Sequence, residues 1–238
     1  MKSPIFAGLT DPGRQRDHNE DAYALAPELG IAVLADGMGG HNAGDVASDI
    51  AVNTTMAILR QTAGLSAHDR LETAVQAAHA GIREKAASSA RYHGMGTTVV
   101  ALLLDGAKLT VAHVGDSRLY RLRRGQLTAL TRDHSLLQEF IDKGLYTPEE
   151  ARAKVARNIL THALGLEEAL KLDIGQHGTE AGDRYLICSD GLYEMVNDTE
   201  IAALLGRGGK PADICPVLVE LANAKGGKDN ITVVVIDT

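Results

Sequence analysis

The chain has few aromatic residues: Phe, Trp and Tyr make up 3% of its 238 residues, and Trp does not occur. Its core must therefore be built from aliphatic side chains. Apolar residues make up 45% of the sequence, which is enough for one large core. With no repeat and no clear linker, we expect residues 1–238 to form a single domain.

Cysteine is also scarce. Cys188 lies in an apolar run and Cys215 in a helical pattern, and neither has the spacing of a CxxC pair or of a Cys/His zinc site. We therefore expect two buried thiols, and neither a disulfide nor a cysteine nucleophile.

The sequence has neither an excess of basic residues nor a long apolar run. A net charge of −7 argues against binding to nucleic acid or to an anionic membrane. The first residues lack the apolar segment of a secretion signal, and no apolar run is long enough to span a bilayer. We expect a cytoplasmic protein without a membrane or nucleic-acid partner, and a monomer by default.

One stretch, residues 31–44, organises the rest. An apolar run typical of a buried strand ends at Asp36, and a glycine-rich turn and His41 follow it. A strand that ends on Asp-Gly holds the carboxylate at the rim of a sheet, and the glycines let the backbone approach a ligand closely. This stretch predicts a functional site.

Hydrophobic periodicity predicts an alternation of strands and helices along the chain. Two long helices, 44–58 and 66–86, have an apolar face that would cover a sheet, and Ser66 is the expected cap of the second. Residues 133–169 differ in character and are interpreted as a flap inserted beside the site, in which Thr147 and Glu150 form a capping box. Asp198 is the expected cap of a later helix. The expected strands are 3–9, 22–25, 31–35, 97–104, 108–114, 118–122, 126–130, 170–177, 184–189 and 231–236.

Five aspartates lie next to expected strands: Asp21, Asp36, Asp116, Asp190 and Asp229. Carboxylates gathered at one rim repel one another unless a cation neutralises them, and hard oxygen ligands select Mg²⁺ or Mn²⁺. A calcium-binding loop fits poorly, because the sequence has no DxDxDG run with a glutamate at the twelfth position. For Asp116 a simple tight turn is an equal alternative, and the polar loop before Asp21 could be only a solvated loop.

Two further residues suit the chemistry of phosphate esters. Arg16 could clamp phosphate oxygens bidentately, and His41 could protonate a leaving oxygen. Two divalent ions sharing a water would supply hydroxide near neutral pH. The sequence does not show the distances between these groups.

Ordered motifs cover essentially the whole chain. They are Arg16-x-x-Asn19-Glu20-Asp21, Asp36-Gly-Met-Gly-Gly-His41, Gly96-Thr97-Thr98, Gly115-Asp116-Ser117-Arg118, Ser189-Asp190-Gly191-Leu192 and Asp229-Asn230-Ile231-Thr232. Together they resemble the motifs of the PP2C-type (PPM) metal-dependent serine/threonine protein phosphatases, and especially the small bacterial members. The resemblance implies an α+β fold, the αββα four-layer sandwich, in which two antiparallel sheets pack face to face between helices.

The resemblance also implies a role for each site residue. Asp36 would bridge two Mn²⁺ or Mg²⁺ ions, and the carbonyl of Gly37 would be a further ligand. Asp190 and Asp229 would bind one ion, and Asp21 and Glu20 would hold the other side, largely through waters. Asp116, with Asp190, matches the ligands of a third, weaker metal site. Arg16 would bind the substrate phosphate, and His41 would be the general acid.

The implied reaction is dephosphorylation of phosphoserine and phosphothreonine in proteins, by in-line attack of a metal-bridged water. A cognate Ser/Thr kinase, or its targets, would be the partner. Two alternatives remain: a catalytically inactive phosphatase-like regulatory module, and a hydrolase of small phosphate esters. The chain departs from the family pattern at Lys154-Val155 and at His162, where members often carry His-Pro and Arg. His113 and His134 are interpreted as structural, with His113 a hydrogen-bonded core or edge residue.

Overall fold

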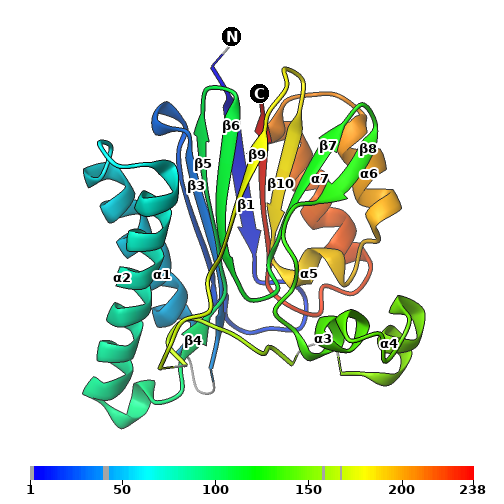
Figure 1. The fold of residues 1–238 in the computed structure, drawn as a ribbon. Coiled ribbons are helices and arrows are strands. Elements are labelled where there is room, and N and C mark those ends of the chain that lie inside the picture. The colour runs from blue at the N-terminus through cyan, green and yellow to red at the C-terminus, as the bar shows by residue number, and fades with distance from the viewer. Residues whose placement is uncertain (1–2, 40–42, 157–158, 167) are drawn as a thin grey trace.

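The computed structural model describes residues 3–39, 43–156, 159–166 and 168–238. Two antiparallel sheets pack face to face, and helices cover the outer face of each (Figure 1). The α+β four-layer sandwich expected from the sequence is confirmed. Within the described residues, no helix is both long and apolar enough to cross a bilayer.

One sheet has the strand order β1-β11-β10-β7-β8, with antiparallel pairing throughout. Its outer face is covered by the last helices of the chain. The strands are β1 (Ile5–Asp11), β7 (Arg118–Arg123), β8 (Gln126–Ala129), β10 (Arg184–Cys188) and β11 (Ile231–Asp237), and the helices are α5 (Asp190–Tyr193), α6 (Asp198–Gly206) and α7 (Pro211–Ala224).

The other sheet has the order β2-β3-β5-β6-β9, and the short strand β4 also pairs with β3. Helices α1 and α2 cover its outer face (Figure 1). The elements are β2 (Asp21–Ala26), β3 (Ile31–Met38), α1 (Gly44–Gln61), α2 (Ala67–Ser88), β4 (Gly96–Thr97), β5 (Val99–Asp105), β6 (Lys108–Val114) and β9 (Asp173–Gly178), with single 3₁₀ turns at Pro27–Leu29 and Ala90–Tyr92.

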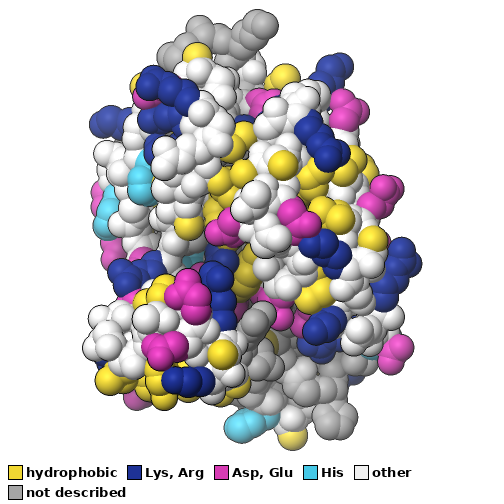
Figure 2. Space-filling view, turned by 90° about the vertical axis from the view of Figure 1, so that its right-hand side faces the viewer, with side chains coloured by type: hydrophobic (Ala, Val, Ile, Leu, Met, Phe, Trp, Pro, Cys, Tyr) yellow, Lys and Arg dark blue, Asp and Glu magenta, His cyan; other side chains and the backbone are white. Residues whose placement is uncertain are grey.

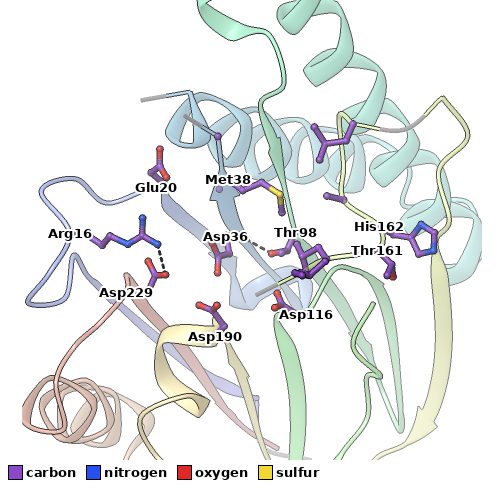
Figure 3. Close-up of a pocket in the computed structure, with 16 residues that line it drawn as sticks. Arg16, Glu20, Asp36, Met38, Thr98, Asp116, Thr161, His162, Asp190 and Asp229 are labelled. Atoms are coloured by element: carbon purple, nitrogen blue, oxygen red, sulfur yellow. Dashed lines mark hydrogen bonds and ion pairs between the residues drawn. The ribbon is translucent and has the colours of Figure 1, made fainter. Parts of the chain in front are cut away.

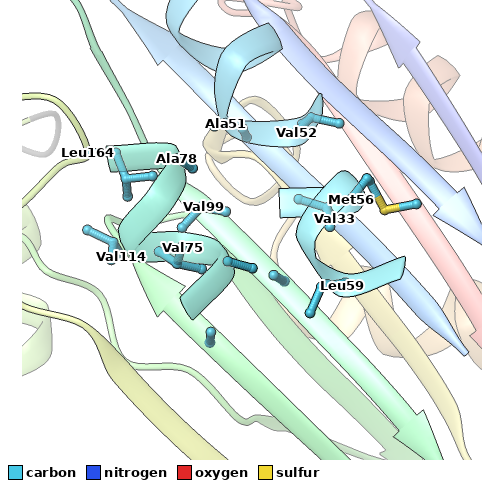
Figure 4. Close-up of a cluster of buried hydrophobic side chains, with 14 of the residues drawn as sticks. Val33, Ala51, Val52, Met56, Leu59, Val75, Ala78, Val99, Val114 and Leu164 are labelled. Carbon is cyan, nitrogen blue, oxygen red and sulfur yellow. The ribbon is translucent and has the colours of Figure 1, made fainter. Parts of the chain in front are cut away.

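Aliphatic packing explains why the central strands are apolar on both faces. Between the sheets, Leu34 and Val100 meet Ile187 and Val234 of the facing sheet. On the outer face, small residues such as Ala51 and Ala78 let α1 and α2 approach the sheet closely (Figure 4). A strand covered on both sides reads as a continuous apolar run, as β3 and β11 do.

The helix starts confirm some local predictions and correct others. Ser66 caps α2 by accepting from the Asp69 N–H, and Thr147 and Glu150 form the expected capping box of α4 (Pro148–Lys154). Asp198, however, is the first residue of α6. The cap is Asn197, whose side-chain oxygen accepts from the Glu200 N–H.

The thiols of Cys188 and Cys215 are buried and free, as expected. The interpretation of His113 as a core residue is confirmed. Its side chain is buried in β6, and its ring lies against that of His134, with 4.8 Å between the ring centroids.

Candidate metal-dependent active site

The predicted site residues lie where strands begin or end, at the end of the sandwich opposite the two termini (Figure 1). Asp21 and Asp36 are direct cross-strand partners in β2 and β3. Asp116 lies in the turn between β6 and β7, Asp190 follows β10, and Asp229 precedes β11. The topology therefore gathers aspartates that are distant in the sequence at one rim.

A cavity of about 580 Å³ opens at this rim. Figure 3 shows Asp36, Asp116 and Asp190 pointing toward one another within it. Arg16, Glu20 and Asp229 lie on one side, and Thr161 and His162 on the other (Figure 3). The predicted residues that line the cavity are Arg16, Glu20, Asp36, Gly37, Asp116, Asp190 and Asp229.

Like charges crowd this cavity. Burial and repulsion by the other four aspartates hold the pKa of Asp36 well above its ordinary value. Burial, with repulsion led by Asp116 and Asp229, does the same to the pKa of Asp190. For Asp116, burial raises the pKa to about 7, and Asp133 adds to the effect. A cation beside these aspartates would favour their ionised forms, because it offsets both the burial and the repulsion.

Asp21 lies deeper than the cavity wall and is held on one side only. Its Oδ2 accepts hydrogen bonds from the hydroxyls of Ser189, at 2.8 Å, and Thr232, at 2.7 Å. Its Oδ1 is buried and has no partner among the described residues. Burial raises the pKa of Asp21 to about 6, against the effect of the two hydroxyls.

Two charged side chains form the outer rim. The guanidinium of Arg16 donates to Asp229 Oδ2 at 2.7 Å, and the Arg16 side chain is 52% exposed. Glu20 lies beside the N-terminus of α1, where the Gly44 N–H partly offsets the rise that burial causes in the pKa of Glu20. The Arg16 guanidinium therefore lies at the mouth of the cavity, where it is accessible from solvent.

Gly37 is required by close packing. A Cβ at this position would lie 2.2 Å from the Gly44 carbonyl oxygen and 2.5 Å from the Glu20 carbonyl oxygen. Its N–H donates to the Glu20 carbonyl. The chain can therefore turn away from Asp36 only with glycine as the next residue.

The donor set fits divalent cations. Several carboxylates share one cavity, most of them buried and raised in pKa, and the buried Asp21 Oδ1 has no partner. Arg16 is the one Lys or Arg side chain among the described residues that line the cavity. Oxygen-only ligands in this number are typical of Mg²⁺ and Mn²⁺.

His41, the predicted general acid, lies outside the described residues, between Gly39 and Ala43. The structure brings together the other predicted residues, Arg16, Glu20, Asp21, Asp36, Gly37, Asp116, Asp190 and Asp229. The role of Arg16 in binding phosphate and the roles of the others in holding metal ions stay predictions.

Several residues that hold the site had been given no role. Thr98 Oγ1 accepts from the Asp36 N–H at 3.0 Å, and the Tyr193 hydroxyl donates to the Asp116 carbonyl at 3.1 Å. Asn230 Oδ1 accepts from the Glu20 N–H at 2.8 Å. Ser189 and Thr232 hold Asp21. Thr98, Ser189, Asn230 and Thr232 lie inside the family motifs, so the sequence marked them as part of the site. Their individual roles became clear only from their hydrogen-bond partners in the folded chain.

The predicted flap forms a lobe with two short helices, α3 (Leu136–Asp142) and α4 (Pro148–Lys154). Figure 2 shows this lobe set off from the rest of the molecule by a hollow. Ser135, Leu137 and Arg152 line a space of about 780 Å³ whose other side is formed by residues of α5 and α6. His162 and Thr161 return along the wall of the active-site cavity. Lys154 lies over the Tyr146 ring, 4.9 Å from its centroid, and does not line the cavity.

Comparison with known proteins identifies relatives along the whole chain. The profile of the family described as Protein phosphatase 2C matches residues 13–221. The chain is 38% identical over 235 residues to the serine/threonine phosphatase stp of Listeria monocytogenes, which covers 96% of this chain and 93% of that protein.

Solved structures agree. The crystal structure of the Mycobacterium tuberculosis serine/threonine phosphatase PstP/Ppp superposes with a TM-score of 0.92 at 39% identity, covering 98% of both chains. The catalytic domain of the phosphatase PstP in complex with two manganese ions superposes with a TM-score of 0.90 at 37% identity, covering 98% of this chain and 97% of that one.

Proposed function

The chain belongs to the protein phosphatase 2C family, and from its site we propose how it acts as a metal-dependent serine/threonine phosphatase of phosphorylated proteins. The observation that carries the proposal is the convergence of carboxylates from separate strands on one cavity with an arginine at its mouth. A cofactor of two Mn²⁺ or Mg²⁺ ions belongs to this function.

Asp36, Asp190 and Asp229, with the carbonyl of Gly37, are the proposed first ligands of the two ions. Asp21 and Glu20 would hold waters on the other side, and Asp116 with Asp190 would form a third, weaker site. When bound, the ions supply an acidified water as the nucleophile and positive charge for the phosphate oxygens. The raised pKa values of the buried aspartates support this assignment, because a cation relieves their repulsion.

The chain's own residues would orient the substrate. Arg16 can release Asp229 and bind two phosphate oxygens with its planar guanidinium. The Thr98 hydroxyl accepts from the Asp36 N–H and so helps to hold the backbone that carries this carboxylate at the cavity. His41 remains the proposed donor of the proton to the leaving serine or threonine oxygen.

The presence of every expected carboxylate argues against an inactive regulatory module. We further propose that a Ser/Thr kinase, or the targets of such a kinase, supplies the substrates, and that the chain acts as a monomer.

The test compares release of phosphate from a phosphothreonine protein with hydrolysis of a small phosphate ester, with Mn²⁺ and with a chelator. The chelator should abolish both activities, and the protein substrate should compete effectively against the ester. Preference for the ester would favour the alternative of a small-ester hydrolase.

Substitution of the proposed metal ligands tests whether the phosphatase activity resides in this cavity. Asp36→Asn and Asp190→Asn should each lower kcat/KM by about two orders of magnitude or more, because each removes a charged ligand. Asp49→Asn, on the exposed face of α1, is the matched control and should leave kcat/KM unchanged. Near-normal turnover by the Asp36 or Asp190 variant would refute the assignment.

A further inference from the structure

The turn that carries Asp116 is held by the residues that lead into the flap. Gly115 has a φ of 105°, and a Cβ there would lie 2.6 Å from Thr98 Cγ2, so this backbone has little freedom. The His134 N–H donates to the Gly115 carbonyl at 2.7 Å, and the Gly115 N–H donates to His134 Nδ1 at 3.3 Å. His134 thus binds both polar backbone groups of the residue before Asp116.

These contacts set the tautomer of His134. Nδ1 accepts a hydrogen bond and therefore carries no proton, so the proton is on Nε2. That nitrogen lies 3.1 Å from Asp173 Oδ2, which accepts from it. The ring is almost fully buried, and burial lowers the pKa of His134, in keeping with a neutral imidazole. Asp173 is the first residue of β9.

The backbone of His134 also holds the returning end of the flap. Its carbonyl accepts from the Thr161 N–H at 2.9 Å, and the next residue pairs with Leu160 in an isolated β-bridge. Asp133, on the other side, binds the guanidinium of Arg118 at 2.9 and 2.6 Å. One residue therefore connects the Asp116 turn, the cavity wall at Thr161 and the start of β9.

We propose that His134 is a positioning residue for Asp116: by accepting from the Gly115 N–H with Nδ1 and donating to Asp173 with Nε2, it fixes the carboxylate in the cavity. This inference rests on the proposed function, in which Asp116 belongs to the weakest of the metal sites. Residues that orient a ligand without touching the metal commonly change metal affinity by about 10- to 100-fold when replaced.

Two isosteric variants separate this role from a general contribution to folding. In His134→Asn, the amide oxygen can take the place of Nδ1 and accept from the Gly115 N–H, while the link to Asp173 is lost. In His134→Gln, the longer amide can reach Asp173 and the acceptor for Gly115 is lost. Both variants remove the imidazole, so a purely structural role predicts similar losses in both.

The measurement is calorimetric titration of each purified protein with Mn²⁺, together with thermal unfolding in chelator. We expect His134→Gln to bind the weakest Mn²⁺ about tenfold less tightly than His134→Asn does, with similar unfolding temperatures for the two. Equal affinities, or the reverse order, would overturn the proposal.

A second pair of variants carries the test if His134→Gln does not fold. Asp173→Asn keeps an oxygen that accepts from Nε2, whereas Asp173→Ala removes it and frees the tautomer. Weaker binding of Mn²⁺ by the alanine variant than by the asparagine variant supports the proposal, and equal binding contradicts it. If the unaltered protein binds no Mn²⁺, the proposed function itself fails, which is distinct from a failure of the role of His134.

Discussion

At the residue scale, the buried Asp21 shows how the fold prepares a carboxylate. Hydroxyls of Ser189, which directly follows β10, and of Thr232 in β11 satisfy one oxygen, and the other has no hydrogen-bond donor among the described residues. Unpartnered buried oxygens are costly, and a cation at this position would offset that cost, in keeping with the predicted place of Asp21 in the site. The sequence predicted Asp21 as part of the site. Its hydroxyl partners, 168 and 211 residues further along the chain, could not be predicted, because no local pattern encodes that proximity.

His113 provides a test of a buried group that lies outside the site. Burial, together with the neighbouring His134, lowers the pKa of His113 to about 3. In the unfolded chain, His113 binds a proton as the pH falls below its ordinary pKa of about 6.5. In the folded chain, the same side chain stays neutral until the pH approaches 3. The contribution of His113 to the pH dependence therefore lowers the free energy of unfolding as the pH falls from 6.5 toward 3, and it has no effect above pH 6.5.

The substitution His113→Leu should remove this decrease in the free energy of unfolding at low pH. Between about pH 7 and pH 5, the free energy of unfolding of the unaltered protein should fall by about 2 kcal/mol more than that of the variant. Urea unfolding of the metal-free proteins at the two pH values measures the difference. The exposed His68 gives the control, since His68→Leu should leave the pH dependence of the unaltered protein in place. Identical pH dependence in His113→Leu would contradict the argument.

At the element scale, local signals predicted most of the helices and strands, and missed the ones that depend on partners. The capping box of α4 and the Ser66 cap of α2 depend on residues within one turn. Strand β4 has two residues and exists because Gly37 and Met38 pair with it. Helix α5 is a single turn after β10, and it begins at Asp190 itself. Neither element is long enough to produce a hydrophobic periodicity that the sequence could reveal.

The close packing of α2 on its sheet gives a prediction at this scale. Ala78 is completely buried in the contact with the sheet, whereas Ala80 is exposed on the same helix. Ala78→Leu should lower the free energy of unfolding by about 1–3 kcal/mol through overpacking, and Ala80→Leu by less than about 0.5 kcal/mol. Urea denaturation distinguishes the two, and equal effects would be inconsistent with the layer arrangement.

At the scale of the whole molecule, function depends on the convergence of strand ends. The sequence predicted which residues carry the chemistry, because five acids lie at the ends of different expected strands and the family motifs contain them in the same order. It could not show that Arg16 pairs with Asp229 or that Lys154 lies away from the cavity, since both facts follow from how the loops pack. The position of His41 is outside the described residues and stays a prediction.

The central claim is that the carboxylates of this cavity hold metal ions for the reaction. The most direct measurement is the number of Mn²⁺ ions bound per chain, by calorimetric titration of the unaltered protein and of Asp36→Asn, with Asp49→Asn as the control. The account predicts at least two ions in the unaltered protein and in the control, as in the manganese complex of PstP, and fewer in Asp36→Asn. No bound Mn²⁺ in the unaltered protein, or the same number at the same affinity in Asp36→Asn, would contradict it.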